Sequence, residues 1–483
     1  MSRFKYFSTL TCFLVFAVAA AAQTVDPCAS SNQKVACTIP QVYGPGGLSA
    51  ATGDLVHNGH EGHFDNSFNT NLANPLNSGI ASQLALLPIA APSSGIAFTY
   101  DKSLGVSVAS NESFGPILSE RAKTIGRHRL HFGFSYEYFH FNSIDGVSLH
   151  SIPAVLTHAD DSIDNPGATC SITTSSNKKK CAFVRDVITT VNSIDLVMNQ
   201  YTAYAGFGLT KNIDVSVAIP IVNVRMRAAS NATIINNSGS PDHEFAADPN
   251  CPAGEIAADG NCLHHLFDQP GRHSAGIGDV TFRVKGTIWQ GEHAGIAAGL
   301  DVRVPTGDTL NFQGSGATAV RPFGVWSYSG RISPHVNAGY EIDGDSVLAG
   351  DLATGAKKHL PNQFVYSAGV DAGIVRRLTL AFDLIGQLVF DGKQVSVASQ
   401  SFLGPCNTDV PFGATGCLTP APNVNRLNLA TNSGNYTITN ASFGVRVNPF
   451  KRLLISGSVL VKLGDGGLRA DFVPLFSVSY TFR

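Results

Sequence analysis

The segment from residue 54 to 65 concentrates side chains that could bind a metal ion. It contains Asp54, His57, His60, Glu61, His63 and Asp65. The run His60-Glu61-Gly62-His63 is one residue short of the His-Glu-x-x-His spacing with which a helix presents two histidines to zinc, and its glycine content argues against a helix. We therefore expect a polar, exposed segment, with a metal site at His57, His60 and His63 as the alternative.

The sequence has few other patterns that are typical of catalysis. It contains no Gly-x-Ser-x-Gly elbow and no Walker A loop, and Gly314-Ser315-Gly316 lies between predicted strands, where a dinucleotide site would need a following helix. An enzyme would also need a Ser, His and acid set, and the two histidines expected inside the fold, His131 and His335, have no evident nucleophile partner. We therefore predict no catalytic residue and no cofactor.

The cysteines form four close pairs once Cys12 is assigned to the leader. They are Cys28 with Cys37, Cys170 with Cys181, Cys251 with Cys262, and Cys406 with Cys417. Each pair lies in a stretch rich in Pro, Gly, Asn and Asp, which predicts loop-closing disulfides made in an oxidising compartment, three of them in extracellular loops. Each should stabilise its loop by about 2 to 3 kcal/mol. A metal site is the weaker alternative, because no Cys-x2-Cys spacing occurs.

Alternating apolar and polar residues predict twelve strands in the remainder of the chain. In the first, Leu130, Phe132 and Phe134 alternate with His131 and Gly133. The twelve segments lie near residues 127–141, 188–209, 213–228, 275–290, 294–305, 317–329, 332–343, 362–375, 378–391, 436–447, 452–463 and 470–482.

The connections between these strands predict an antiparallel outer-membrane β-barrel. Every second connection is tight, and most of the others are long, as in bacterial barrels with periplasmic turns and extracellular loops. Twelve strands place both ends of the barrel in the periplasm. A barrel of fourteen strands, with two added from the N-terminal region, is the alternative.

Charged residues occupy one parity of these strands, which distinguishes a membrane barrel from a soluble β-sandwich or propeller. A charge facing lipid at mid-membrane costs about 2 to 4 kcal/mol for Arg or Lys, so charges should face inward. The candidates for the lumen wall are His131, Glu137, Asp214, Asp279, Arg283, Lys285, Asp301, Arg303, Arg321, His335, Glu341, Asp371, Asp383, Arg446, Lys462 and Asp471. The near balance of acids and bases favours mixed ion pairs over an ion-selective ring. The alternative is that these residues only solvate the wall or pair with a plug. Asp195, Arg225 and Arg227 are exceptions, toward the long-loop ends.

Residues 1–22 are predicted to be a secretory signal peptide, with a basic start, an apolar stretch from Phe7 to Ala19 and a run of alanines before Gln23. Residues 23–126 do not alternate. They contain a helix candidate, 78–87, and a hairpin candidate, 96–109, and should form a periplasmic or plug-like segment before the barrel of residues 127–483.

Composition agrees with this interpretation. Only 14% of the 483 residues are charged, against about 25% in soluble domains, yet beyond residue 22 no apolar run approaches the roughly 18 residues of a membrane-spanning helix. A net charge of −2 gives no sign of a nucleic-acid partner.

Short glycine-rich motifs resemble a known family. Gly276-Ile277-Gly278-Asp279-Val280, Val304-Pro305-Thr306-Gly307-Asp308, the stretch Tyr204–Leu209 and Asn337-Ala338-Gly339-Tyr340 are similar to those of outer-membrane transporters associated with the MetA pathway of phenol degradation. The resemblance covers roughly residues 127–345. It implies a barrel for the passage of small, often aromatic or hydrophobic, compounds, and it supplies no catalytic residues.

The expected function is passive uptake of small hydrophobic or aromatic solutes across the bacterial outer membrane. The expected partners are outer-membrane lipid and lipopolysaccharide, the barrel-assembly machinery and the solutes themselves. A structural or adhesive barrel acting through disulfide-closed loops is one alternative, and an outer-membrane enzyme is another. The sequence does not determine the oligomeric state.

Overall fold

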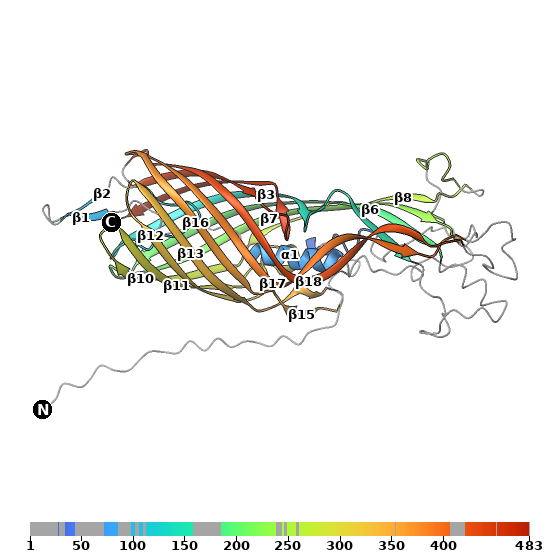
Figure 1. The fold of residues 1–483 in the computed structure, drawn as a ribbon, viewed down its shortest axis with the longest axis horizontal. Coiled ribbons are helices and arrows are strands. Elements are labelled where there is room, and N and C mark those ends of the chain that lie inside the picture. Colours follow the sequence, from blue (N-terminus) through green and yellow to red (C-terminus); the bar gives the residue numbers. More distant parts are fainter. Residues whose placement is uncertain are drawn as a thin grey trace, which may run out of the picture.

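The computed structural model describes residues 28, 34–43, 72–85, 98–101, 106–109, 113–157, 185–237, 244–245, 249–256, 260–352, 354–405, 421–450 and 452–482. Twelve long strands close into an antiparallel barrel (Figure 1). They are β3 (Leu130–Ile144), β6 (Val187–Gly208), β7 (Ile213–Ile235), β10 (Val280–Gln290), β11 (Ala294–Val304), β12 (Ala319–Tyr328), β13 (Ile332–Asp343), β16 (Gln363–Val375), β17 (Leu378–Phe402), β18 (Val424–Val447), β19 (Leu453–Lys462) and β21 (Phe472–Phe482).

Pairing between the last strand and the first closes the barrel. The β21–β3 register runs from Leu475 opposite Glu137 to Phe482 opposite Leu130. The prediction of twelve strands is therefore confirmed, and the fourteen-strand alternative is wrong. The predicted hairpin near 96–109 does form, as β1 (Phe98–Asp101) and β2 (Val106–Ala109), but these strands pair only with each other in a separate sheet.

Shorter strands complete the sheets. They are β4 (Val147–Ser148), β5 (Ile152–Thr157), β8 (His264–Asp268), β9 (Arg272–Ile277), β14 (Asp345–Asp351), β15 (Ala356–His359) and β20 (Leu468–Ala470). The predicted strand 275–290 is interrupted, because β9 and β10 pair with two different stretches of β7. Between them, the Gly278 N–H donates to the Pro220 carbonyl oxygen at 2.8 Å. The strand predicted to begin at residue 470 is β21, which begins at Phe472, and residue 470 instead ends the separate strand β20.

Two of the predicted strands are much longer than expected. The strand predicted to end at residue 391 continues to Phe402, and its partner β18 begins at Val424 rather than at residue 436. The register of the pair shifts between Val389 and Gly392, and the pairing continues beyond it. Together with β6 and β7, these strands extend beyond the barrel at the end opposite the C-terminus (Figure 1).

The outer face of the barrel is apolar and the inner face carries the charges. On β10, Phe282 and Val284 are 51% and 50% exposed. Lys285, the next residue along the strand, points to the other face and is 2% exposed. An outward apolar band around a closed barrel is the signature of an outer-membrane protein, as the sequence predicted. No helix in the described part of the chain is long and apolar enough to span a membrane.

The three exceptional outward charges lie in ion pairs on the extended strands. Arg227 donates to both oxygens of Asp268 on β8, at 2.5 and 3.1 Å. Arg225 lies 3.6 Å from Asp195. Their position toward the long-loop ends agrees with the prediction.

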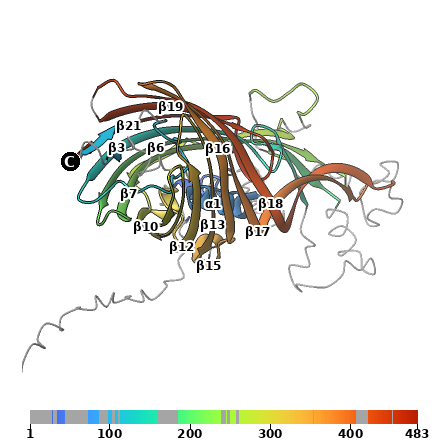
Figure 2. The same cartoon turned by 60° about the vertical axis from the view of Figure 1, so that its left-hand side comes forward.

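Helix α1 (Asn74–Ala85) lies inside the barrel, and both views show it enclosed by the strands (Figure 2). Leu72, Leu76 and Ile80 are completely buried. The helix begins four residues before the predicted start at Ser78, because Pro75 in the first turn needs no N–H donor there.

A tight turn leads the chain out of the lumen and into β3. Gly126 has a φ of +96°, and the His128 N–H donates to the Gly208 carbonyl oxygen at 2.7 Å. A Cβ on Gly208 would lie 1.9 Å from the Gly126 carbonyl oxygen, so only glycine permits this close approach.

Candidate functional site

A cavity of about 180 Å³ lies in the lumen, and its walls differ in character. One wall, from β10 to β13, carries Arg283, Asp301, Arg303, Arg321 and Glu341. The other, from β3 and β19 to β21, carries Phe139, Phe141, Leu460, Leu468, Arg469, Ala470 and Val473. Residues 113–126, which we call the lumenal segment, contribute Leu118, Ser119 and Glu120. The cavity can therefore offer apolar contact and polar contact to one small molecule.

The charged wall follows from the register of neighbouring strands. Asp301 on β11 lies opposite Arg283 on β10 and opposite Arg321 on β12. Arg283 donates to both oxygens of Asp301, at 2.6 and 2.8 Å, and Arg321 donates to one of them at 2.6 Å. Such charge-assisted forks fix both partners, so this wall is rigid.

Arg303, two residues beyond Asp301 on β11, is also held by carboxylates. Arg303 donates to Glu341 at 3.1 Å and to Asp343. It also lies 4.0 Å from Asp279. Asp279 in turn accepts from the Gly307 N–H at 3.1 Å and from the Ser315 hydroxyl at 2.8 Å, which ties the loop after β11 to the barrel wall.

Sequence reasoning missed the apolar wall. Phe139 and Phe141 on β3 are buried and stack with ring centroids 5.8 Å apart. A signal was present, because both share the parity of His131 and Glu137 rather than that of the lipid-facing Phe132 and Phe134. An aromatic residue on the lumen parity indicates an apolar surface inside the barrel.

The lumenal segment is bound to the wall by buried ion pairs, which the sequence analysis also missed. Glu120 accepts from Lys285 at 2.9 Å and from Arg283 at 2.5 Å. Arg121 donates to Asp371 at 2.7 Å. These two residues stand in a stretch without periodicity, so no pattern in the sequence gave their direction.

Backbone groups of the lumenal segment are also paired with side chains of the wall. Four N–H groups donate to four different strands: Phe114 to Thr379, Glu120 to Asn337, Ala122 to Ser327 and Ile125 to Asp214. The Arg446 guanidinium returns a bond to the Phe114 carbonyl oxygen at 3.0 Å. The segment thus occupies a fixed position across the lumen, near the tight-turn end of the strands.

His335 does not form a nucleophile pair. Its Nε2 lies 2.6 Å from Asp383 and its Nδ1 lies 3.3 Å from Asp371. The Ser119 hydroxyl donates to Asp383 at 2.9 Å rather than to the imidazole. A serine hydrolase needs a hydroxyl bonded to the histidine, so this arrangement holds the lumenal segment in place and activates no hydroxyl.

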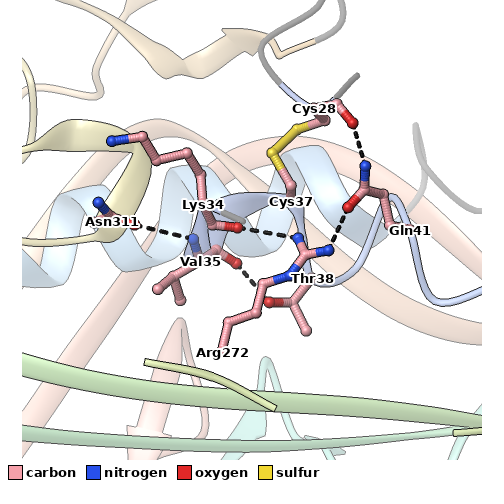
Figure 3. The surroundings of a disulfide bond; sticks show 8 residues. All are labelled: Cys28, Lys34, Val35, Cys37, Thr38, Gln41, Arg272 and Asn311. Carbon is pink, nitrogen blue, oxygen red and sulfur yellow. Dashed lines mark hydrogen bonds between the residues drawn. A yellow bond between two sulfur atoms is a disulfide. The ribbon is translucent and has the colours of Figure 1, made fainter. Parts of the chain in front are cut away.

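A second N-terminal stretch is bound at the long-loop end of the lumen, around the Cys28–Cys37 disulfide (Figure 3). Arg272 of β9 donates to the Lys34 carbonyl oxygen at 3.1 Å and to Gln41. The Val35 N–H donates to Asn311 at 3.2 Å. These contacts attach the short helix η1 (Val35–Cys37) to β9 and to η3 (Thr309–Asn311).

An ion pair at this attachment lies outside the membrane-spanning strands. The Lys34 ammonium donates to Asp308 at 2.6 Å. Partial burial raises the pKa of Asp308, but the Lys34 charge and the Asn311 amide outweigh it, so the pKa lies below its ordinary value. Both side chains remain about one-third exposed.

The other predicted wall residues have local partners. His131 bonds Thr481 at 2.9 Å, and Glu137 accepts from Gln200 at 3.0 Å. Lys462 lies 2.9 Å from Asp471, whose side chain is 54% exposed. Of the sixteen predicted residues, five line the cavity directly: Arg283, Asp301, Arg303, Arg321 and Glu341.

Two of the four predicted disulfides are confirmed, Cys28–Cys37 and Cys251–Cys262. The cysteines of the other two pairs, at 170, 181, 406 and 417, lie outside the described residues. The predicted signal peptide, 1–22, and the histidine cluster, 54–65, lie there too. Within the described part of the chain, no group of three or more His, Cys, Asp or Glu side chains is placed to hold a metal ion.

The fold and the lumen define a class, that of outer-membrane β-barrels with an occupied lumen. Residues 187–375 match the family described as "Putative MetA-pathway of phenol degradation". This confirms the resemblance inferred from the sequence motifs over β6 to β16. No curated relative matches the chain in sequence.

Solved structures align with the chain at low sequence identity and low TM-score. An outer-membrane channel from Pseudomonas putida F1 is 9% identical, with a TM-score of 0.41, over 75% of this chain and 99% of that one. A FadL homologue from Pseudomonas aeruginosa is 10% identical, with a TM-score of 0.28, over 74% and 90%. The toluene transporter TbuX from Ralstonia pickettii is 10% identical, with a TM-score of 0.25, over 74% and 90%.

Proposed function

We propose that the chain is an outer-membrane channel for the passive passage of small hydrophobic or aromatic compounds, partly occluded by its own N-terminal region. The observation that carries this proposal is the lumen cavity with one apolar wall. Its volume of about 180 Å³ compares with the roughly 150 Å³ that accommodates benzene in an engineered protein cavity. The matching family's connection with phenol degradation also supports an aromatic substrate.

The lumenal segment and α1 account for the occlusion in this proposal. Both lie within the barrel, on the path between its two ends, so a solute must pass beside them or wait for them to move. We expect flow to be downhill, because no energy-coupling motif occurs in the sequence. Lipopolysaccharide and the assembly machinery remain expected partners of the barrel.

Solute uptake into liposomes tests the proposal. Liposomes with the full chain should take up toluene and phenol faster than empty liposomes, and a chain lacking residues 24–95 should pass them faster still. Sucrose serves as the polar control, and its uptake should be slow in the full chain. If neither protein passes aromatic solutes faster than empty liposomes, transport is refuted. A structural or adhesive role for the strands beyond the barrel then becomes the better interpretation.

A further inference from the structure

Four arginines line the cavity, and one differs from the other three. Arg283, Arg303 and Arg321 each lie within 4.0 Å of at least two carboxylates. Arg469, on β20, makes no ion pair with any residue that the structure describes. It stands on the apolar wall, between Leu468 and Ala470.

The surroundings of Arg469 hold its guanidinium through neutral acceptors alone. Its Nη2 donates to the Thr439 carbonyl oxygen and to the Asn440 side chain, both at 2.8 Å. Its Nε is buried and has no hydrogen-bond partner among the described residues, and the whole residue is 3% exposed. The Asp465 carboxylate has an electrostatic effect on Arg469, but its side chain is 70% exposed and lies 3.7 Å from Lys462.

A buried guanidinium without a carboxylate is an unusual arrangement in a folded protein. Burial removes water from the charge, and the loss is offset only when an anion or a full set of hydrogen bonds replaces it. The other cavity arginines meet this requirement within the protein. Arg469 meets it only in part, and it faces a space large enough for a small molecule.

We propose that Arg469 is an anion-binding residue and that the cavity accepts aromatic monocarboxylates of benzoate size. The ring would contact Phe139, Phe141 and Leu460, and the carboxylate would accept from the Arg469 guanidinium where it lines the cavity. This inference rests on the proposed function and narrows its substrate class.

The opposite wall restricts the charge of the ligand. Its arginines are already paired with Asp301 and Glu341, so a second anionic group on the ligand would find no unpaired cation there. A cationic group in place of the carboxylate would meet Arg469 itself. One negative charge on an otherwise apolar molecule is therefore the pattern that the cavity matches.

Equilibrium dialysis of the purified full chain in detergent tests the assignment, with benzoate and its uncharged ester methyl benzoate as probes. The wild type should bind benzoate more tightly than the ester. Arg469→Gln should weaken benzoate binding at least tenfold, about 1.4 kcal/mol, and leave binding of the ester unchanged. Arg469→Lys, which keeps the charge but loses the planar guanidinium, should bind benzoate more tightly than Arg469→Gln and less tightly than the wild type.

Arg377→Gln is the matched control, because Arg377 lies in an exposed turn and donates to the Pro449 carbonyl oxygen outside the cavity. It should bind both probes as the wild type does. Equal benzoate binding by wild type and Arg469→Gln would overturn the inference. So would a wild type that binds the ester as tightly as benzoate, a comparison that stands even if Arg469→Gln fails to fold.

The liposome experiment separates this inference from the proposed function. Toluene carries no charge, so its passage does not depend on Arg469. Toluene uptake without selective benzoate binding would leave the channel intact and remove the anion site.

Discussion

Two parts of the N-terminal region occupy the same lumen by different physical means. The lumenal segment is attached by buried ion pairs and by directed hydrogen bonds to individual strands, whereas α1 is packed through apolar side chains. Gly79 of α1 faces Ile144 and Leu468, and a Cβ there would be in ordinary contact with both, at 3.7 and 3.9 Å. Polar attachment fixes one position, because each bond has a specific geometry, while apolar packing tolerates small shifts. We infer that the lumenal segment sets the position of the N-terminal region relative to the strands, and that α1 mainly fills the lumen.

The largest loss of stability is expected from removing the Glu120 carboxylate, which pairs with two cations of the wall. Glu120→Ala should lower the free energy of unfolding by about 3 to 5 kcal/mol, because Lys285 and Arg283 lose a buried partner. Urea titration of the detergent-solubilised protein measures the change. Glu292→Ala is the control, since that side chain is 90% exposed. A decrease in the free energy of unfolding of less than about 1 kcal/mol would mean that these ion pairs do not hold the lumenal segment in place.

A somewhat smaller effect is expected on the apolar side. Leu76→Ala should lower the free energy of unfolding by about 3 kcal/mol, because a fully buried side chain leaves a cavity within the lumen. Leu266→Ala, at a position 56% exposed on β8, should change it little. If α1 were loosely held, the two variants would unfold at the same urea concentration, and the contrast between the two regions would disappear.

The smallest effect concerns the Lys34–Asp308 pair, which is partly exposed. Asp308→Asn should cost at most about 1 kcal/mol at neutral pH. Because the folded-state pKa of Asp308 is lowered, the contribution is complete above the ordinary pKa of 3.8 and is lost as the pH falls through the lower folded value. Unfolding measured at pH 7 and at about pH 2 should show the wild type and the variant converging in acid. A difference that persists at the lower pH would exclude this ion pair as its source.

The barrel could be predicted from sequence because lipid imposes one rule on every strand. Phe282 and Val284 must face outward and Lys285 inward, and that alternation is visible in the residues alone. The same rule fails for β17 beyond residue 391, where the strands leave the membrane and polar side chains on both faces cost nothing. The stretch from Gly392 to Phe402 therefore looked like a loop.

The site was predictable only where the barrel itself supplied the residues. The charged wall follows from the inward parity of β10 to β13, so Arg283 and Asp301 were found. Glu120 and Arg121 were not, because the lumenal segment has no repeating geometry, and its contacts exist only once distant strands are assembled around it. Arg469 was not predicted for a related reason: it precedes the predicted strand 470–482, and its own strand, β20, is only three residues long.

The lumenal segment is joined to β3 by a short connection. Only four peptide bonds separate Gly126 from Leu130, where the barrel begins. A segment that leaves the wall therefore stays tethered to the barrel end and meets its binding groups at an effective concentration in the millimolar range. Rebinding is unimolecular and independent of protein concentration. A free peptide with the sequence of residues 113–126 would have to reach comparable concentrations to take its place.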